Sequence, residues 1–444
     1  MTTYTDLVTS DQAHMLHPLQ HPAAHAAPLI FARGEGVWLY TVDGRPILDG
    51  LAGLWNVLVG HGRVELAAAA QQQMTALAYC SNYAGTSNLP AIALAERLAG
   101  FAYPNLHYTY FTSGGAEANE SAFKTARYYW KRLGKPNKVK VIARQDAYHG
   151  VTLAAMSATG ITPYWPMFEP RVPGFLHIVA PYPYRFAGDT RPGESIGQAA
   201  ARALEQAILR EGPDSVAAFI AEPVQGAGGV IVPPDDYFPR VREICDQYGV
   251  LFIADEVITG FGRTGDWFAL NRWGVQPDIL SFAKGITSGY LPLGGIQVSD
   301  TIRDVILSAP PAERWMHAYT YSGHPTCCAV ALANLDILAQ EALPAQAAAM
   351  GQRLLAGLAA LQELDCVGDV RGLGLMAAVE FVADKETKTP AGIANNILAA
   401  CLERGLLTRT KGESLLLAPP LIISAAEVDQ ILAIVRAAIE TVAS

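Results

Sequence analysis

The sequence predicts an α/β fold built on a mostly parallel sheet, with a smaller α+β part formed by both ends of the chain. Apolar segments that read as strands alternate with helical stretches through the middle, which is typical of a helix-covered parallel sheet. Beyond Cys327 the chain changes to Ala- and Leu-rich helices around short strands. Near the start, residues Ile30 to Asp49 carry a hairpin signal. We expect this hairpin to join the C-terminal part.

The elements of the central sheet are read from apolar runs that turn signals interrupt. Seven strands are expected at Leu106–Thr112, Val139–Arg144, Leu176–Ala180, Val216–Glu222, Leu251–Glu256, Ile279–Ala283 and Gly294–Ser299. Helices are expected at Val64–Leu77, Ala116–Leu133, Ser195–Arg210, Asp236–Tyr248, Cys328–Gln340, Ala345–Leu361 and Ala425–Val442. The domain boundaries predicted from this order are an N-terminal arm and part of the small domain (1–58), a large domain (59–327) and a C-terminal small domain (328–444).

The N-terminal region combines an irregular start with a hairpin. The residues through Pro28 are rich in His, Pro and Ala and lack periodicity, so we expect an extended surface arm rather than a metal site. In the hairpin, VWLYTV and RPILD flank Asp43-Gly44, a favoured two-residue turn. Trp55 follows in a glycine-rich loop, where core packing is favoured over a place in a pocket wall.

The composition restricts the classes of function. A chain of 444 residues, 51% of them hydrophobic, can bury a large core. A net charge of -9 without a basic stripe argues against nucleic acid as a partner. The start lacks a signal-peptide pattern, and no apolar run reaches the ~18 residues of a membrane span, so we expect a cytoplasmic protein. The six cysteines lack CxxC spacing and are expected to be reduced and mostly buried, with no metal site.

The stretch from Leu251 to Gly285 places charged residues at the ends of two predicted strands. Asp255 and Glu256 end the first strand, and Lys284 ends the second. Parallel sheets bind ligands outside the carboxyl ends of their strands, so an acid and a lysine there can face one molecule. Enzymes that use pyridoxal phosphate need this pair, the lysine for a Schiff base and the carboxylate beside the pyridine nitrogen.

Three other strand ends carry residues that suit the same cofactor. Gly114 and Gly115 precede a predicted helix, whose N-terminus can bind a phosphate. Tyr148 follows the second strand and can stack on a flat ring, and Glu222 ends the fourth strand. Each feature alone also fits an ordinary turn, a surface loop or a cap, and Lys284 alone fits a surface lysine. Their combination with Asp255, a carboxylate directly after four apolar residues, favours the cofactor site.

One motif points elsewhere. The residues from Gly260 to Gly265 match GxGxxG, the fingerprint of a dinucleotide-binding loop. That loop should lie directly between a strand and a helix and be followed about 20 residues later by an acid at a strand end. Here the glycines begin four residues after the strand, and only Asp278 precedes the next strand. We therefore interpret the segment as a loop, which leaves a nicotinamide dehydrogenase as an alternative without support.

With these residues in view, the chain resembles the class III, fold type I pyridoxal phosphate aminotransferases over nearly its whole length. The most specific segments are IADEVITGFGRTG and PDILSFAKGITSGYLPLGG, supported by EPVQGAGG, DAYHG and TYSGHP. GLWNVLVGHG and GLLTRTKGESLLLAPPLIIS are similar to the ω-transaminase branch, which takes ω-amino acids or amines as donors and pyruvate as acceptor. The resemblance implies a ping-pong transamination with pyridoxal 5'-phosphate. An aminomutase, a decarboxylase or a 2-oxoglutarate-dependent aminotransferase of the same class is the alternative, and a purely structural role the least favoured.

The resemblance also implies the roles of individual residues. Lys284 would be the Schiff-base lysine and Asp255 the pyridinium partner. The cofactor would further be held by Gly115, Ala116, Tyr148, Glu222, Val257 and, from the second subunit of a homodimer or dimer of dimers, Thr320. The family commonly has Ser where this chain has Ala116, so one hydroxyl donor to the phosphate is missing. Arg409 matches a mobile arginine that pairs with a substrate carboxylate, and the pocket wall would include Trp55, Tyr83 and Tyr164 or Trp165.

Overall fold

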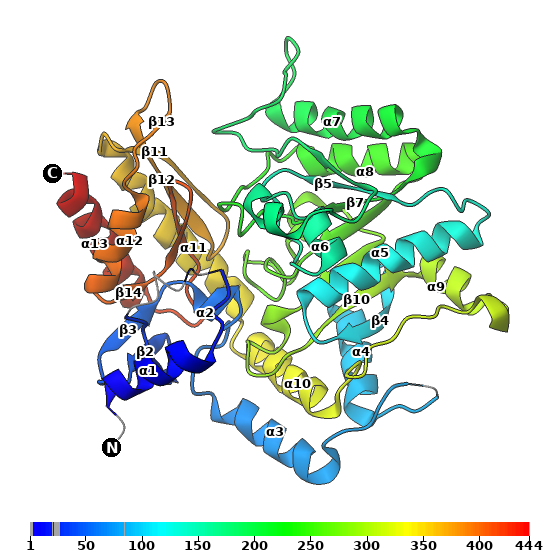
Figure 1. The fold of residues 1–444 in the computed structure, drawn as a ribbon, viewed down its shortest axis with the longest axis horizontal. Coiled ribbons are helices and arrows are strands. Elements are labelled where there is room, and N and C mark those ends of the chain that lie inside the picture. Colours follow the sequence, from blue (N-terminus) through cyan, green and yellow to red (C-terminus); the bar gives the residue numbers. More distant parts are fainter. Residues whose placement is uncertain (1–2, 20, 22–26, 84, 444) are drawn as a thin grey trace.

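A seven-stranded sheet forms the centre of the computed structural model, which describes residues 3–19, 21, 27–83 and 85–443 (Figure 1). The strand order is β4-β10-β9-β8-β7-β5-β6, and only β10 runs antiparallel to its neighbours. Its strands are β4 (Leu106–Thr112), β5 (Lys140–Arg144), β6 (Phe175–Ile178), β7 (Val216–Ala221), β8 (Leu251–Asp255), β9 (Ile279–Phe282) and β10 (Gly294–Ser299). The predicted α/β class, with a mostly parallel sheet of seven strands, is confirmed.

Helices cover both faces of this sheet. One face packs against α5 (Gly115–Arg132), α6 (Leu153–Ala158) and α9 (Asp300–Leu307). The other packs against α4 (Leu89–Phe101), α7 (Ile196–Glu211), α8 (Tyr237–Tyr248) and α10 (Pro325–Gln340), and α3 (Val64–Leu77) lies against α10. The helices that the sequence predicted have boundaries within three residues of the observed ones, whereas α4, α6 and α9 were not predicted.

The alternation along β8 explains how the sheet serves two cores. Leu251 and Ile253 pack into the core on the α5 face, while Phe252 and Ala254 pack into the core on the opposite face. Successive side chains of a strand point to opposite faces, so the next residue, Asp255, points toward α5. The residue after it returns to the other face. One strand thus sends two adjacent carboxylates in opposite directions.

The smaller part joins both ends of the chain, as predicted (Figure 1). Its C-terminal sheet contains β11 (Val367–Gly372), β12 (Ala377–Asp384), β13 (Thr389–Pro390), β15 (Arg409–Lys411) and β16 (Ser414–Leu417). It packs with α11 (Leu343–Ala359), α12 (Ala394–Glu403) and α13 (Ala425–Ala443). A second sheet contains β1 (Phe31–Glu35), β2 (Trp38–Thr41), β3 (Pro46–Asp49) and β14 (Leu406–Leu407), and the parallel pairing of β14 with β3 connects the two ends.

The N-terminal hairpin is confirmed. Strands β2 and β3 pair antiparallel, with Trp38 opposite Leu48. The turn between them contains Gly44 at a φ of 85°, a left-handed conformation that glycine adopts without steric cost. Beyond β3, the predicted loop contains one short helical turn, α2 (Ala52–Trp55), with non-helical residues inside it.

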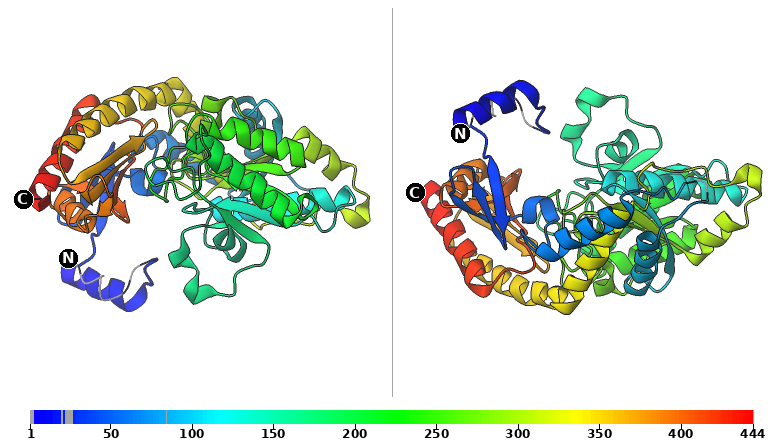
Figure 2. Two further views of the ribbon diagram at one scale, coloured as in Figure 1. Left: turned by 90° about the horizontal axis from the view of Figure 1, so that it is seen from above. Right: turned by 90° about the horizontal axis from the view of Figure 1, so that it is seen from below.

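The predicted extended arm before Pro28 is wrong over the first part of its length. Residues Tyr4–His14 form helix α1, which has no buried residue and projects from the body of the molecule (Figure 2). A capping box starts it, because Thr3 and Asp6 bond reciprocally to each other's backbone amides. This local signal outweighs the lack of an apolar stripe. Residues 20 and 22–26 of the arm lie outside the described residues.

Two further findings concern the apolar helices and the cysteines. No single helix in the described ranges is both long and apolar enough to cross a membrane, and only the pair Pro325–Gln340 and Leu343–Glu363, bent by 60°, passes such a test by length and composition. All six cysteines are free thiols, and four of them are buried, which confirms the prediction that they are mostly buried.

Candidate active site

A cavity of about 170 Å³ lies where β8 and β9 end, beside the start of α5. Strands β7, β8 and β9 are parallel neighbours, so their carboxyl ends meet at one edge of the sheet. The cavity is lined by Gly115, Ala116, Asn119, Tyr148, His149, Gly150, Val151, Glu222, Asp255, Val257, Ile258 and Lys284. The structure therefore brings Lys284, Asp255, Glu222 and Tyr148 together from four separate segments.

Asp255 is buried and almost fully hydrogen-bonded. Its Oδ2 accepts bonds from Asn119 Nδ2 and from His149 Nδ1, each at 2.8 Å, and its Oδ1 accepts the amide of Val257 at 3.1 Å. Only 3% of the residue is exposed. A carboxylate at such a position needs hydrogen-bond donors or a cation, because burial alone disfavours its charge. The donors hold this carboxylate at the cavity wall.

The two side chains that hold Asp255 each leave one buried polar atom without a partner. Nε2 of His149 and Oδ1 of Asn119 have no hydrogen bond. Both residues are buried, and both line the cavity. Unpaired buried polar atoms are rare in folded proteins and mark places where a ligand or an ordered group belongs. This side of the cavity is therefore built to receive a polar molecule.

Lys284 follows β9 and occupies a left-handed backbone conformation, with a φ of 48°. Burial lowers the pKa of its ammonium from the ordinary value of 10.5, although the charges of Asp255 and Glu222 act in the opposite direction. Burial disfavours the charged form of an amine. The chain itself thus shifts Lys284 toward the neutral form that a nucleophile or a base needs.

Glu222 is the second carboxyl at this edge, and its pKa shifts the other way. Its two oxygens accept the amides of Tyr148 at 2.9 Å and of Gly226 at 3.0 Å. Its pKa is raised to about 7, mainly by burial and also by the nearby charge of Asp255, against the opposing effect of His149. Glu222 joins the loop after β7 to the loop that carries Tyr148.

The rings and small residues around the cavity define its walls. Tyr148 lines the cavity, and the ring of Tyr164, which does not line it, lies 5.8 Å from the ring of Tyr148 at 53°. On the opposite side, a Cβ added to Gly115 would lie 2.8 Å from Cγ1 of Val257, so only glycine lets the start of α5 approach this valine. A flat ring between Tyr148 and Val257 would have an aromatic and an aliphatic face as neighbours.

The first turn of α5 points free amides toward the cavity. Its first intrahelical bond runs from the amide of Ala118 to Gly114 O at 3.0 Å, and Glu117 accepts the amide of Ser113. The amides of the first helical residues, including Gly115 and Ala116, have no partner within the helix. With the positive end of the helix dipole, they form a site for an anion such as a phosphate.

Arg409 lies on β15, in the smaller part of the protein, and is half-buried. Its positive charge lowers the pKa of both Tyr148 and Lys284, although burial shifts the pKa of Tyr148 upward overall. The guanidinium therefore lies within electrostatic reach of the cavity. No ion pair holds it among the described residues. It remains available to a negatively charged ligand.

The remaining predicted residues do not line this cavity. Trp55 is 98% buried, with its indole N–H unpaired. Tyr83 is exposed and lines a separate, larger cavity of about 1010 Å³. Trp165 donates to Thr159 O at 3.0 Å and packs on His177, and Thr320 accepts the hydroxyl of Tyr79 at 2.8 Å. Their predicted roles stay predictions.

The GxGxxG segment is a loop in the structure and begins no α-helix. Gly262 has a φ of 102° and packs against Leu421 and Pro344 of the smaller part. The segment thus serves as a contact between the two parts of the chain. This finding confirms its interpretation as a loop.

Sequence reasoning missed Asn119 and His149. Asn119 lies one turn after Gly115 on α5, so the same helical face reaches both the predicted phosphate site and Asp255. His149 directly follows Tyr148, and both residues line the cavity. The i, i+4 spacing was a usable signal for Asn119. Nothing local distinguishes His149 from a surface histidine.

Comparison with known proteins agrees with this geometry. The family model of class-III aminotransferases matches residues 19–439. The putrescine–pyruvate aminotransferase of Pseudomonas aeruginosa is 41% identical over 422 residues, covering 94% of this chain and 91% of that protein. The diaminobutyrate–2-oxoglutarate transaminase of Halomonas elongata is 39% identical and covers 100% and 97%, respectively.

Solved structures give the same assignment. A thermostable (S)-enantioselective ω-transaminase from Thermomicrobium roseum is 49% identical, has a TM-score of 0.95, and covers 100% of this chain and 99% of that one. An ω-transaminase from Pseudomonas jessenii, solved with PMP, is 39% identical with a TM-score of 0.95 over 98% of each chain. The family match spans most of the chain, and the fold and the residues of the cavity agree with it. The chain belongs to the class-III aminotransferases.

Proposed function

We propose that this protein is a pyridoxal phosphate-dependent aminotransferase that moves an amino group from an ω-amino acid or amine to pyruvate. The observation that carries the proposal is the placement of Lys284 and Asp255 at the ends of neighbouring strands, on one cavity. The likeness to a putrescine–pyruvate aminotransferase and to ω-transaminases supports the choice of substrates.

The cavity fits the cofactor on chemical grounds. Asp255 supplies a carboxylate for a pyridinium nitrogen, Lys284 an amine for an aldehyde, and the first amides of α5 a site for a phosphate. Tyr148 and Val257 supply the two faces for a ring. When bound, the cofactor supplies an electron sink for the carbon that carries the amino group of the substrate.

Lys284 serves as the base in this proposal. Burial lowers its pKa, so that its Nζ is ready to accept the proton from the substrate carbon that bears the amino group. Asp255 stays in place through the donors Asn119 and His149, which keep its carboxylate oriented. Glu222 ties together the two loops that shape the wall of the site.

Arg409 selects carboxylate-bearing substrates. A guanidinium binds a carboxylate through two parallel hydrogen bonds, and this one is not committed to an ion pair in the described part of the protein. Pyruvate carries such a carboxylate, as do ω-amino acids. A neutral amine donor carries none, so only some half-reactions need Arg409.

We infer that the working protein is a homodimer or a dimer of dimers. Thr320 lies beside Tyr79, away from the cavity of its own chain, and the segment around it borders a cavity of about 1010 Å³. Exposed apolar side chains gather in this region, among them Met316 at 70% and Tyr321 at 59% exposure. A second subunit would cover them and receive Thr320 at its phosphate site.

The test is a panel of donors with pyruvate as the acceptor, scored by the formation of alanine. The panel contains ω-amino acids, diamines and both enantiomers of an aryl-alkyl amine. Turnover should show ping-pong kinetics and should vanish in Lys284→Ala together with the yellow colour of the bound cofactor. Exposed Lys135 gives the matched control, because Lys135→Ala should keep both. Normal turnover in Lys284→Ala would overturn the proposal.

A second acceptor deserves a place in the same assay. The relative that covers the whole chain at 39% identity acts on 2-oxoglutarate, so glutamate formation is the alternative outcome. An aminomutase or a decarboxylase would form neither alanine nor glutamate from these acceptors. The panel therefore separates the class-III activities from one another.

A further inference from the structure

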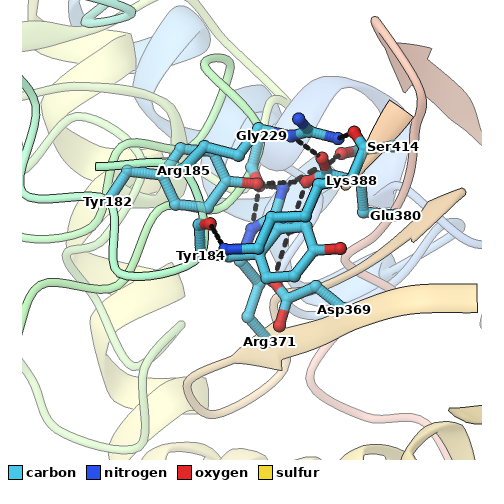
Figure 3. Close-up of polar contacts among 9 residues, drawn as sticks. All are labelled: Tyr182, Tyr184, Arg185, Gly229, Asp369, Arg371, Glu380, Lys388 and Ser414. Atoms are coloured by element: carbon cyan, nitrogen blue, oxygen red, sulfur yellow. Dashed lines mark hydrogen bonds and ion pairs between the residues drawn. The ribbon is translucent and has the colours of Figure 1, made fainter. Parts of the chain in front are cut away.

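A polar cluster joins the two parts of the protein (Figure 3). We call it the Arg371 cluster. Its members come from the loops after β6 and β7 and from β11, β12 and β16, and they include Tyr182, Arg185, Gly229, Arg371, Glu380 and Ser414. Nothing in the proposed mechanism uses these residues. Their contacts nevertheless lead to two groups that it does use.

Arg371 forms the centre of the cluster. Its Nε and Nη2 donate to the carbonyl of Gly229 at 2.9 and 2.6 Å, across the boundary between the two parts. Its Nη1 donates to Oε2 of Glu380 and to Oδ2 of Asp369, each at 2.9 Å. Only 10% of the side chain is exposed. Arg371 thus clamps a backbone carbonyl of the large part while it is held by carboxylates of the small part.

Glu380 receives donors from both parts. Tyr182 and Arg185, in the loop after β6, each donate to it. These donors and Arg371 lower the pKa of Glu380 despite its burial. Figure 3 shows the side chains converging on this carboxylate. A buried ion pair of this kind contributes little net stability but defines one relative position of its partners.

The first route from Arg371 leads to the strand of Arg409. Its Nη2 donates to Oγ of Ser414 at 3.0 Å. Ser414 of β16 pairs with Lys411 of β15, and Leu416 pairs with Arg409. Arg371 therefore holds β16 at Ser414, two residues before Leu416, the residue that lies opposite Arg409.

The second route leads to Glu222. The loop after β7 closes on itself, because the amide of Gly229 donates to Gly226 O at 3.1 Å. The amide of Gly226 in turn donates to Oε2 of Glu222, whose Oε1 holds the amide of Tyr148. A second contact runs in parallel, from Lys411 Nζ to Oδ1 of Asp146 at 3.9 Å. The same clamp thus touches the loops that form the wall of the cavity.

We propose that Arg371 is a positioning residue for carboxylate-bearing substrates, because it fixes the strand of Arg409 against the loops of the cavity. This inference rests on the proposed function. Substrate atoms must be placed to within about 1 Å for full turnover, and a loose clamp would let Arg409 drift by that amount. A neutral amine makes no use of Arg409, so its half-reaction is insensitive to the clamp.

An arginine is needed at this position for geometric reasons. Its fork contacts one carbonyl with two nitrogens while a third nitrogen reaches the carboxylates. A lysine keeps the charge and leaves Glu380 paired, but it cannot make both sets of contacts. Arg371→Lys is therefore the variant that weakens the contact with the carbonyl of Gly229 and still pairs the buried carboxylate of Glu380 with a positive charge. Ser414→Ala removes the link from Arg371 to β16 and the weaker bond of the Ser414 hydroxyl to Glu380, and leaves the contacts of Arg371 with Gly229 and the carboxylates in place.

The experiment compares two half-reactions of the cofactor-loaded enzyme. One is the reaction with pyruvate, measured as KM and kcat, and the other is the single turnover with a neutral aryl-alkyl amine. In Arg371→Lys we expect the KM for pyruvate to rise about tenfold while the single-turnover rate stays within about twofold. Ser414→Ala should show the same selectivity at a smaller size. The matched control is Thr410→Val, on the same strand as Arg409, which removes the bond from Thr410 Oγ1 to Asn395 of α12.

Three results would overturn the inference. Equal losses in both half-reactions would show a general structural role, and an unchanged KM for pyruvate in both variants would show that the clamp does not matter. A selective loss in Thr410→Val as large as in Arg371→Lys would show that any disturbance of β15 has this effect. If Arg371→Lys does not fold, Ser414→Ala decides. Failure of the wild type to form alanine is a different result and concerns the proposed function alone.

Discussion

Replacing Glu222 with glutamine should change how the stability of the cofactor-free protein depends on pH. Burial raises the pKa of this carboxyl from 4.5 to about 7. The folded chain then binds a proton between these pH values that the unfolded chain releases. The contribution of Glu222 to the free energy of unfolding is therefore fully present below pH 4.5 and is lost as the pH rises through 7. Glutamine carries no charge at any pH and removes the effect.

The size of the effect follows from the two pKa values. The interval from 4.5 to about 7, at roughly 1.4 kcal/mol per pH unit, gives a change of about 3.5 kcal/mol in the free energy of unfolding. For 444 residues this corresponds to roughly 4 °C in Tm. Glutamine also loses one of the two accepted amides, of Tyr148 or Gly226, at a cost of about 1 kcal/mol at every pH.

The assay is the Tm of cofactor-free wild type and Glu222→Gln at pH 5 and pH 8.5, at one scan rate. The variant should melt within about 0.5 °C of the wild type at pH 5, where the lost hydrogen bond and the partial titration nearly cancel, and about 2.5 °C above it at pH 8.5. Comparing the two proteins cancels the titration of every other group. A difference in Tm that is the same at both pH values would refute the buried, proton-binding Glu222.

Three further substitutions test individual contacts. Asn119→Asp replaces a donor to Asp255 with a like charge, so the cofactor should dissociate about tenfold more readily in equilibrium titration, and unchanged affinity would contradict the assigned contact. Ala116→Ser adds a hydroxyl at the start of α5 and should tighten cofactor binding about fivefold in the same titration, whereas no gain would show that this position does not face the phosphate. Arg409→Leu should raise the KM for pyruvate about tenfold or more and spare the single turnover with a neutral amine, and an equal loss in both would argue against carboxylate recognition.

The parts of the fold that follow from local patterns could be predicted from the sequence. The apolar runs of β8 and β9 and the charged residues at their ends placed Asp255 and Lys284 on one edge. Helix α1 was missed although its signal, Thr3 with Asp6, is local, because the surrounding Pro and His outweighed it. Boundaries shifted by a few residues, as expected where helix ends depend on caps.

The contacts between distant segments could not be predicted. Arg371 bonds to Gly229, 142 residues earlier in the chain, and no spacing rule connects the two. His149 reaches Asp255 across 106 residues. Such contacts depend on how distant segments pack, around one sheet for His149 and Asp255 and between the two parts for Arg371 and Gly229. This packing is the sum of many interactions rather than a property of any one stretch. The residues that hold the chemistry were therefore visible, and those that orient it were not.

The adjacent acids Asp255 and Glu256 show why position outweighs residue type. Glu256 points to the opposite face, where Thr259, Tyr103 and backbone amides satisfy both of its oxygens. Asp255 points toward α5, where its partners Asn119 and His149 retain unpaired atoms. The carboxyl of Glu256 is thus enclosed in a core. The carboxyl of Asp255 instead lines the cavity, beside polar atoms of Asn119 and His149 that have no hydrogen-bond partner. Composition predicts two acids at a strand end, but the alternation of the strand decides which of them is available for chemistry.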